Sequence, residues 1–263
     1  MSVLNYLDNL SKDAILKEDE KKSISKSILN LDIRLKYFFE NEISETLQFG
    51  SSRRETILPR KMDENSDIDY MIIFADDSYE PQTYLNKLKS FADKYYQFSV
   101  VAQSSPAIVI ELNHIKFELV PAIKNIGLGD PYKIPGKQNS YTKWIYTNPN
   151  DFNEKLIEKN MRHGFKLKPM IRLMKYWNAL NNHPFDSYLL EKHISEHSYT
   201  GLNNIKDMLY EYVSYFAAKN DAPQTTKDKV LKLKNSIRKI KDYEAFEDYK
   251  NAELEIKKLL PEV

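Results

Sequence analysis

The chain has 263 residues, of which 41% are hydrophobic and 29% are charged, a composition typical of folded globular proteins rather than of disordered chains. Its 39 basic and 38 acidic side chains nearly cancel to a net charge of +1, whereas proteins that coat long nucleic acids usually carry a clear basic excess. Cysteine is absent, which excludes disulfides and thiolate metal sites. The apolar run 71–75 is far shorter than the roughly 20 residues of a membrane span. With no signal-like N-terminus, the sequence predicts a cytoplasmic protein that neither enters a membrane nor binds long nucleic acid stably.

The first part of the chain has the patterns of a mixed α/β fold. Apolar residues recur at three- and four-residue spacing over 18–47, which predicts one long helix. Residues 67–75 alternate as a strand does, with Ile68, Tyr70, Ile72 and Phe74 on one face. Pro81 then opens a helix that is expected to run to about Tyr95.

Further strands are predicted before residue 121. They are expected over 98–103, 107–112 and 115–120. The last two are separated by Asn113-His114, a two-residue sequence that is compatible with a hairpin turn. After Pro121 the composition changes, and residues 124–150 contain three of the six glycines, which predicts a long loop.

Beyond residue 150 only helical patterns occur. The helices are expected over 151–163, 165–181, 186–197, 202–218 and 226–260. The last one is polarised, because residues 227–241 hold seven basic side chains against one acid, and residues 242–262 hold seven acids against three lysines. Such charge runs are usually solvated helix faces, although a basic block can also contact a partner. The predicted fold is therefore an α/β (α+β) core with a small mixed sheet, followed by an all-helical domain.

Two aspartates open the strand predicted over 67–75. Asp67 and Asp69 are two residues apart, so both carboxylates leave one face with Cα atoms roughly 6.5–7 Å apart. Two carboxylates at that separation can converge on a pair of divalent cations about 3.5–4 Å apart. Hard oxygen ligands favour Mg²⁺ over zinc, and Glu118, near the end of a later strand, is the candidate third ligand. A solvated strand face is an equally good interpretation of the two aspartates taken alone.

Gly50 and Ser51 precede this strand and favour the metal interpretation. The chain has neither a Walker A loop nor the G-x-G-x-x-G dinucleotide fingerprint, so a phosphate site would have to be built differently. A glycine allows close backbone approach, and the N–H groups and the Ser51 hydroxyl can hold phosphate oxygens. The alternative is a plain turn with a helix cap. With so few glycines in the chain, one placed before paired carboxylates is the more specific signal.

The order apolar-Gly-Ser, a spacer, then Asp-apolar-Asp-apolar resembles the DNA polymerase β-like nucleotidyltransferase superfamily. Within it, the segment 50–56 (GSSRRET) is similar to the G-S-x-x-R-x-T form of the bacterial cGAS/DncV-like nucleotidyltransferases (CD-NTases), which are relatives of oligoadenylate synthase. Glu118, followed by Leu-Val-Pro-Ala, resembles the third metal carboxylate of that family, where Asp is more usual. The segments 144–149, 175–178 and 187–191 resemble its helical half.

This resemblance implies a Mg²⁺-dependent enzyme that uses nucleoside triphosphates as donor and acceptor and releases pyrophosphate. The product would be a cyclic or short linear oligonucleotide second messenger of bacterial anti-phage signalling. The catalytic core, with a long N-terminal helix, would span 1–145, and a helical domain over 146–263 would close the active-site groove. Two Mg²⁺ ions, replaceable by Mn²⁺, would be held by Asp67, Asp69 and Glu118.

The nucleotide-binding residues implied by the same resemblance are Gly50, Ser51, Arg54, Lys175 and Ser187. Physically, Lys168, Arg172 and Lys175 fall on one face of the helix predicted over 165–181. Such a stripe is usually solvated, but over a carboxylate cluster it would meet a triphosphate. Ser187 begins the next helix, where free N–H groups favour anions.

Other interpretations stay open at this point. His193 and His197 have the i, i+4 spacing of helical metal ligands, but no third ligand accompanies them, so ordinary packing is favoured. The enzyme could instead extend an RNA 3′ end or modify a protein or small molecule, although the near-zero net charge weighs against RNA. A non-catalytic nucleotide-binding module of the same fold is a further alternative, against which the complete set of three acids argues. A regulatory protein partner is compatible with every alternative.

Overall fold

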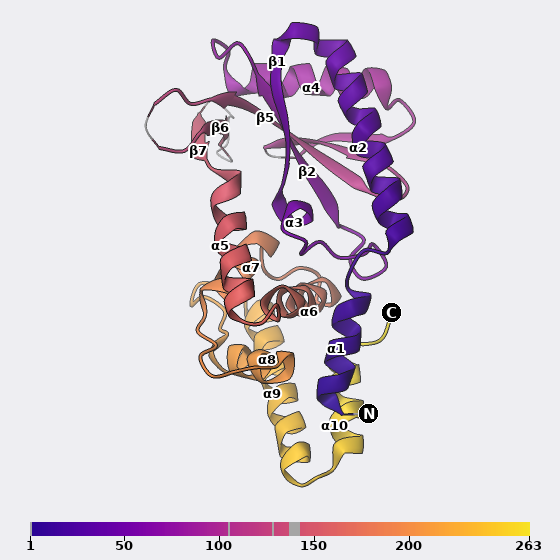
Figure 1. The fold of residues 1–263 in the computed structure, drawn as a ribbon, viewed down its shortest axis with the longest axis vertical. Coiled ribbons are helices and arrows are strands. Elements are labelled where there is room, and N and C mark those ends of the chain that lie inside the picture. Colours follow the sequence, from indigo (N-terminus) through magenta and orange to yellow (C-terminus); the bar gives the residue numbers. More distant parts are fainter. Residues whose placement is uncertain (1, 105, 128, 137–142) are drawn as a thin grey trace. The chain divides into compact units, whose positions relative to one another are not determined.

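The computed structural model describes residues 2–104, 106–127, 129–136 and 143–263 (Figure 1). By its internal contacts the chain divides into two compact units. Residues 17–60 and 65–154 form a sheet unit, and residues 1–16, 61–64 and 155–263 form a helical unit.

The described strands of the sheet unit form one seven-stranded mixed sheet. They are β1 (Ile43–Phe49), β2 (Asp67–Phe74), β3 (Val100–Ser104), β4 (Ala107–Glu111), β5 (Lys116–Lys124), β6 (Tyr132–Pro135) and β7 (Trp144–Thr147). The order is β1-β2-β5-β4-β3, with β6 beside β5 and β7 beside β6. β2 and β5 run parallel, whereas the other pairs are antiparallel. The predicted small mixed sheet is confirmed.

Helices α2 (Glu18–Phe39) and α4 (Pro81–Tyr95) pack against one face of this sheet (Figure 1). On β2, the ring of Phe74 lies 5.4 Å from that of Phe39 and 4.8 Å from that of Tyr84, measured between centroids. The Tyr70 hydroxyl, on the same face of β2, donates a hydrogen bond to Asp32 of α2 at 2.5 Å. Because side chains alternate along a strand, Asp67 and Asp69 leave the opposite face.

The helix predicted over 18–47 is shorter in the structure. α2 stops at Phe39, a 3₁₀ turn covers Glu40–Glu42, and the remaining residues form β1. The backbone leaves the right-handed helical region at Glu40, where φ is +47°. β1 then pairs with β2 from Ile43 opposite Phe74 to Phe49 opposite Asp69. This pairing between distant segments outweighs the local helical periodicity.

Other predicted elements of the sheet unit have mixed outcomes. The strand over 67–75, the helix from Pro81 and the hairpin between β4 and β5 are confirmed. The long loop predicted over 124–150 is wrong in part, because β6 and β7 pair within it and α5 (Pro149–Arg162) begins before its end. Residues 137–142 of that segment lie outside the described residues.

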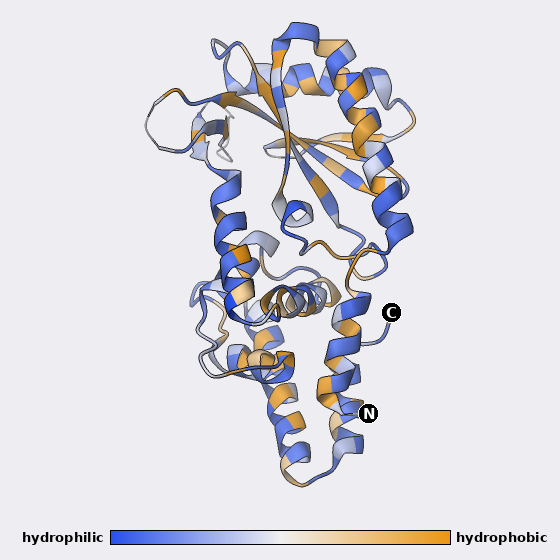
Figure 2. Ribbon diagram, viewed as in Figure 1, coloured by the Kyte–Doolittle hydropathy of each residue, from blue (hydrophilic) through white to orange (hydrophobic). Residues whose placement is uncertain are grey.

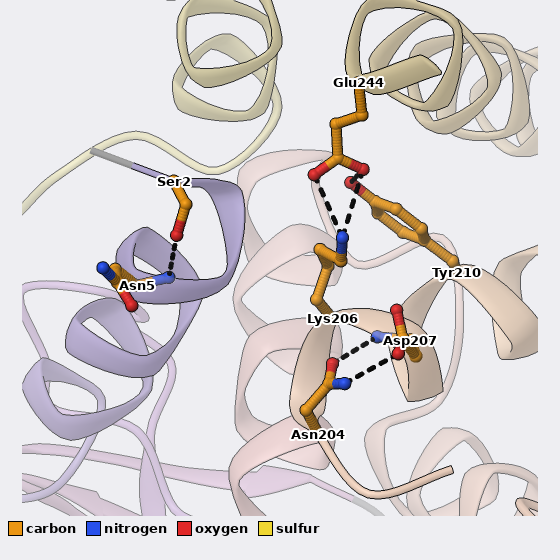
Figure 3. Close-up of polar contacts among 7 residues, drawn as sticks. All are labelled: Ser2, Asn5, Asn204, Lys206, Asp207, Tyr210 and Glu244. Carbon is orange, nitrogen blue, oxygen red and sulfur yellow. Dashed lines mark hydrogen bonds and ion pairs between the residues drawn. The ribbon is translucent and has the colours of Figure 1, made fainter. Parts of the chain in front are cut away.

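Residues 151–263, all of which the structure describes, contain no strand, as predicted. The further helices of the helical unit are α1 (Val3–Asp13), α6 (Leu167–Leu180), α7 (Ser187–Glu196), α8 (Ile205–Tyr215), α9 (Gln224–Ala245) and α10 (Tyr249–Leu259). The N-terminal helix α1, capped by Ser2 (Figure 3), packs with α6, α8 and α10. Its Tyr6 hydroxyl donates a hydrogen bond to the carbonyl of Leu260 at 2.5 Å.

The single helix predicted over 226–260 is two helices. α9 ends at Ala245, Glu247 has a φ of +58°, and Asp248 caps α10 by accepting a hydrogen bond from the Asn251 N–H. The polarised charge pattern is thereby explained, because the two helices pack together and Lys239 of α9 forms an ion pair with Glu255 of α10 at 2.9 Å.

The two C-terminal helices are amphipathic. Hydrophobic and hydrophilic residues alternate along α9 and α10 (Figure 2). Glu244 of α9 accepts hydrogen bonds from Lys206 and Tyr210 of α8 (Figure 3). Within the described part of the chain, no helix is long and apolar enough to cross a bilayer.

Candidate active site

Three carboxylates lie on the sheet face opposite α2 and α4. Asp67 and Asp69 come from the start of β2, and Glu118 comes from β5. The parallel register pairs Asp69 with Glu118 and Asp67 with Lys116. Paired residues on neighbouring strands point to the same face, so the sheet brings all three acids predicted from the sequence onto one surface.

A lysine lies among these acids. The Lys116 Nζ is 3.4 Å from Asp67 Oδ2 and 3.5 Å from Glu118 Oε1. The sequence interpretation did not single out Lys116. The spacing could have indicated Lys116, because a residue two positions before Glu118 on the same strand lies on the same face of the sheet.

The electrostatics of the site reflect this crowding of charge. Burial raises the pKa of Glu118, the neighbouring charge of Asp67 raises it further, and Lys116 only partly offsets both. For Lys116, burial acts to lower the pKa, but the charges of Asp67 and Glu118 outweigh it, so the pKa is raised. The face therefore favours bound positive charge.

Asp67, Asp69 and Glu118 offer only carboxylate oxygens to a divalent cation. No group of three or more Asp, Glu or His side chains converges as a metal cage among the described residues. The chemistry of the donors nevertheless fits Mg²⁺, which prefers carboxylate oxygens. A cation of the chain itself, the Lys116 ammonium, already lies against two of the three carboxylates. The donor types therefore fit a hard cation, whereas their arrangement in the described residues is not that of a metal cage.

Gly50 gives the Asp69 carboxylate its position. The residue follows β1, whose last residue, Phe49, is paired with Asp69. Its φ is +69°, and a Cβ atom built on it would lie only 1.7 Å from Asp69 Oδ2. The Asp69 carboxylate thus packs directly on the backbone at Gly50, an approach that only glycine allows.

The loop after Gly50 is closed by backbone hydrogen bonds. The N–H groups of Thr56 and Ile57 donate to the carbonyl of Ser51 at 2.9 and 3.1 Å. Ser51 is half-buried. Arg54 is buried, and its guanidinium carbon lies 5.1 Å from the centre of the Phe152 ring. A nucleotide-binding role for Ser51 and Arg54 stays a prediction.

Lys175 and Ser187 belong to the helical unit. Lys175 is 5% exposed, and its Nζ lies 3.1 Å from Oε1 of Glu191, which is 0% exposed. Arg172 is also buried and donates to the carbonyl of Ser11 at 3.4 Å. These two members of the predicted basic stripe are therefore not a solvated face. Ser187 is half-buried at the first position of α7.

Glu191 is a second residue that sequence reasoning missed. It lies four residues after Ser187, one turn along α7, and a buried carboxylate at that position needs a cationic partner. A phosphate-binding role for Lys175 and Ser187 stays a prediction.

Comparison with known proteins decides the family. Residues 1–160 match the family model SMODS, the Second Messenger Oligonucleotide or Dinucleotide Synthetase domain. The chain belongs to the SMODS family. This confirms the resemblance to CD-NTases that was drawn from segment 50–56 and the three acids.

A curated relative of this SMODS protein supports the same family assignment. A probable cyclic nucleotide synthase of Bacillus cereus (strain VD146) is 26% identical over 184 residues, which are 56% of this chain and 54% of that protein. The matched region is thus about half the length of this curated relative.

Two solved structures share the fold. CdnC of E. coli MS115-1, in a complex with HORMA-deltaN, has a TM-score of 0.73 at 13% identity, covering 98% of this chain and 96% of that chain. The CD-NTase CdnG of Bradyrhizobium diazoefficiens, in complex with GTP, has a TM-score of 0.70 at 11% identity, covering 96% of both chains. The predicted fold class, a nucleotidyltransferase core with a mixed sheet followed by helices, is confirmed.

The histidine pair of the SMODS protein is part of an aromatic cluster. His193 Nδ1 is hydrogen-bonded to the Tyr212 hydroxyl at 2.9 Å. The His197 ring lies 5.1 Å from Tyr199 and 5.3 Å from Tyr215, measured between centroids. His193 is exposed and His197 half-buried, and the packing of both imidazoles against tyrosines agrees with the favoured interpretation as ordinary packing.

Gly50→Ala should lower activity by about a hundredfold or more, because the added methyl group displaces the Asp69 carboxylate. The positive φ adds a cost of about 1–2 kcal/mol in stability. Pyrophosphate release and thermal melting measure the two effects. Gly201→Ala is the matched control, since Gly201 has a φ of +79° with no atom within 4 Å of the built Cβ. Equal turnover by both variants would contradict the role of Gly50.

Proposed function

We propose that this protein is a nucleotidyltransferase that joins nucleoside triphosphates into a cyclic or short linear oligonucleotide and releases pyrophosphate. The observation that carries the proposal is the grouping of Asp67, Asp69 and Glu118 on one sheet face, with Asp69 packed on Gly50. Membership of the SMODS family supports it. Further support comes from structures of similar fold solved with ATP and with GTP.

The acids are proposed to be the ligands of two Mg²⁺ ions, or of Mn²⁺ in their place. When bound, these cations would neutralise phosphate charge and lower the pKa of the acceptor hydroxyl. Asp67, Asp69 and Glu118 would hold them through carboxylate oxygens. Gly50 keeps the backbone beside Asp69 free of a side chain, so that the Asp69 carboxylate can pack against it.

The remaining nucleotide contacts are proposed from the family pattern. Ser51 and Arg54 of the sheet unit and Lys175 and Ser187 of the helical unit would bind the phosphates of the nucleotide. Positioning and electrostatic stabilisation, rather than covalent chemistry by the protein, would then account for catalysis.

The biological setting is part of the proposal. We propose that the product is a second messenger, as the description of the family model states, and by resemblance to the CD-NTases we place it in the cytoplasm and in bacterial anti-phage signalling. A regulatory protein partner is proposed by analogy with CdnC, which was solved with HORMA-deltaN.

The test is incubation of the purified protein with all four labelled NTPs and Mg²⁺ or Mn²⁺. We expect pyrophosphate release and a labelled product that resists phosphatase if it is cyclic. A parallel reaction with a short RNA tests the alternative, since 3′ extension would lengthen the RNA by discrete steps. No pyrophosphate from any NTP would contradict the proposal and favour the non-catalytic nucleotide-binding module.

Lys175→Ala should raise the apparent KM for NTP more than Lys168→Ala does, because a cation that contacts the triphosphate lowers the free energy of the bound state. The same variant should also lose about 3–5 kcal/mol of stability, because it removes the ion-pair partner of buried Glu191. The double variant Lys175→Met/Glu191→Gln separates the effects. It should melt closer to the parent protein and still have a raised KM, and a parental KM would contradict phosphate binding by Lys175.

A further inference from the structure

The ammonium group of Lys116 forms ion pairs with two carboxylates of the candidate active site. Its Nζ lies 3.4 Å from Asp67 Oδ2 and 3.5 Å from Glu118 Oε1. The Lys116 side chain is 19% exposed, and those of Asp67 and Glu118 are 26% and 28% exposed. The three groups are thus partly shielded from water, where charge interactions are stronger than on an open surface.

The sheet determines this placement. Parallel pairing puts Lys116 beside Asp67, and the two-residue spacing puts it on the same face as Glu118. The flanking residues Ile115 and Phe117 are buried and anchor the strand. On the other side, Glu111 lies opposite Lys116 on β4, and its carboxylate forms an ion pair with Arg60 at 3.4 Å. Sheet pairing thus fixes Lys116 on the acidic face, that is, the sheet face that carries Asp67, Asp69 and Glu118.

A divalent cation and this ammonium group require the same oxygen atoms. Mg²⁺ binds carboxylate oxygens at about 2.0–2.1 Å, well inside the distance at which Lys116 lies from them. Two cations so close together repel each other strongly when they are partly shielded from solvent. A cation bound by both Asp67 and Glu118 must therefore displace the Lys116 ammonium.

We propose that Lys116 is an internal counter-ion of the acidic face, which stabilises Asp67 and Glu118 in the metal-free protein and weakens divalent-cation binding by competing for them. This inference rests on the proposed function, because it takes these two acids to be metal ligands. Its consequence is that the free protein binds divalent cations weakly. Full occupation would then depend on the nucleotide, whose phosphates supply further ligands and negative charge.

The experiment is a titration of the full chain with Mn²⁺ in the absence of nucleotide. The concentration of free Mn²⁺ is measured at each step by electron paramagnetic resonance. Lys116→Met removes the charge and keeps the length of the side chain. It should bind Mn²⁺ roughly five- to tenfold more tightly than the parent protein, as expected when one partly exposed ion-pairing group stops competing. Lys116→Gln is a second neutral variant, in case the first does not fold.

Two controls separate this effect from general charge and packing. Lys124→Met removes a cation from the same strand, where Lys124 forms an ion pair with Glu45 at 3.6 Å. It should leave Mn²⁺ affinity unchanged within about twofold. Lys116→Arg keeps the charge and should also stay near the parent affinity. In thermal melts without metal, Lys116→Met should melt at a lower temperature than the parent, and Mn²⁺ should raise its melting temperature more.

An unchanged or weaker Mn²⁺ affinity of both neutral Lys116 variants would overturn the inference. So would an equal gain of affinity in Lys124→Met, which would indicate a general charge effect. Failure of the proposed function has a different signature, because the parent protein would then release no pyrophosphate from any NTP. Parental turnover combined with identical Mn²⁺ affinities in the parent and Lys116→Met would reject the counter-ion role alone.

Discussion

Asp69→Asn should abolish pyrophosphate release, by about a thousandfold or more, while leaving the fold intact. The substitution is nearly isosteric, so the amide fits the space beside Gly50 in which the carboxylate now lies. It removes one of the negative charges through which the site would hold divalent cations, next to Glu118 in the sheet register. Turnover with Mg²⁺ and thermal melting together measure the effect.

Asp93→Asn is the control for this variant. Asp93 is an exposed residue of α4 whose ion pair with Lys89, at 2.7 Å, lies on the helix surface. Its substitution should leave turnover unchanged and stability within about 1 kcal/mol. Turnover by Asp69→Asn comparable to that of the parent protein would reject the metal-dependent mechanism.

Glu118→Gln should cost several orders of magnitude in rate, roughly a thousandfold, whereas Glu111→Gln should cost little. The two residues are a matched pair, because both are glutamates on neighbouring strands and on the same sheet face. Glu118 is paired with Asp69, but Glu111 is paired with Lys116 and forms an ion pair with Arg60. Single-turnover measurements at saturating Mg²⁺ would compare them directly. A larger loss for Glu111→Gln would show that the third acid was assigned wrongly.

Much of the chemistry of this protein is determined locally. The alternation around Asp67 and Asp69 predicts a strand with both carboxylates on one face, because the side-chain period of a strand is two residues. Gly50 before that strand predicts close backbone approach, which the structure contains as the contact with Asp69. The Asn113-His114 turn predicts the hairpin that includes Glu118. These features depend on residues that are near one another in sequence.

The sequence pattern failed where a segment's conformation depends on a distant partner. Residues 43–47 belong to the helix predicted from the sequence but lie in β1, because β2 offers them a hydrogen-bonded ladder. The periodicity over 226–260 is continuous, yet the chain reverses at Glu247 and packs α10 on α9. Local propensity is a weak preference in both cases, and pairing with a distant segment outweighs it.

Only the tertiary structure determined which charges meet. No sequence pattern singles out Lys116, but the parallel register of β2 and β5 places it against Asp67 and Glu118. In the same way, the buried pairing of Lys175 with Glu191 joins α6 to α7. The physical reason is that Coulomb interaction depends on distance and on exclusion of water. Both are determined by the packing of strands and helices, and a one-dimensional pattern records neither.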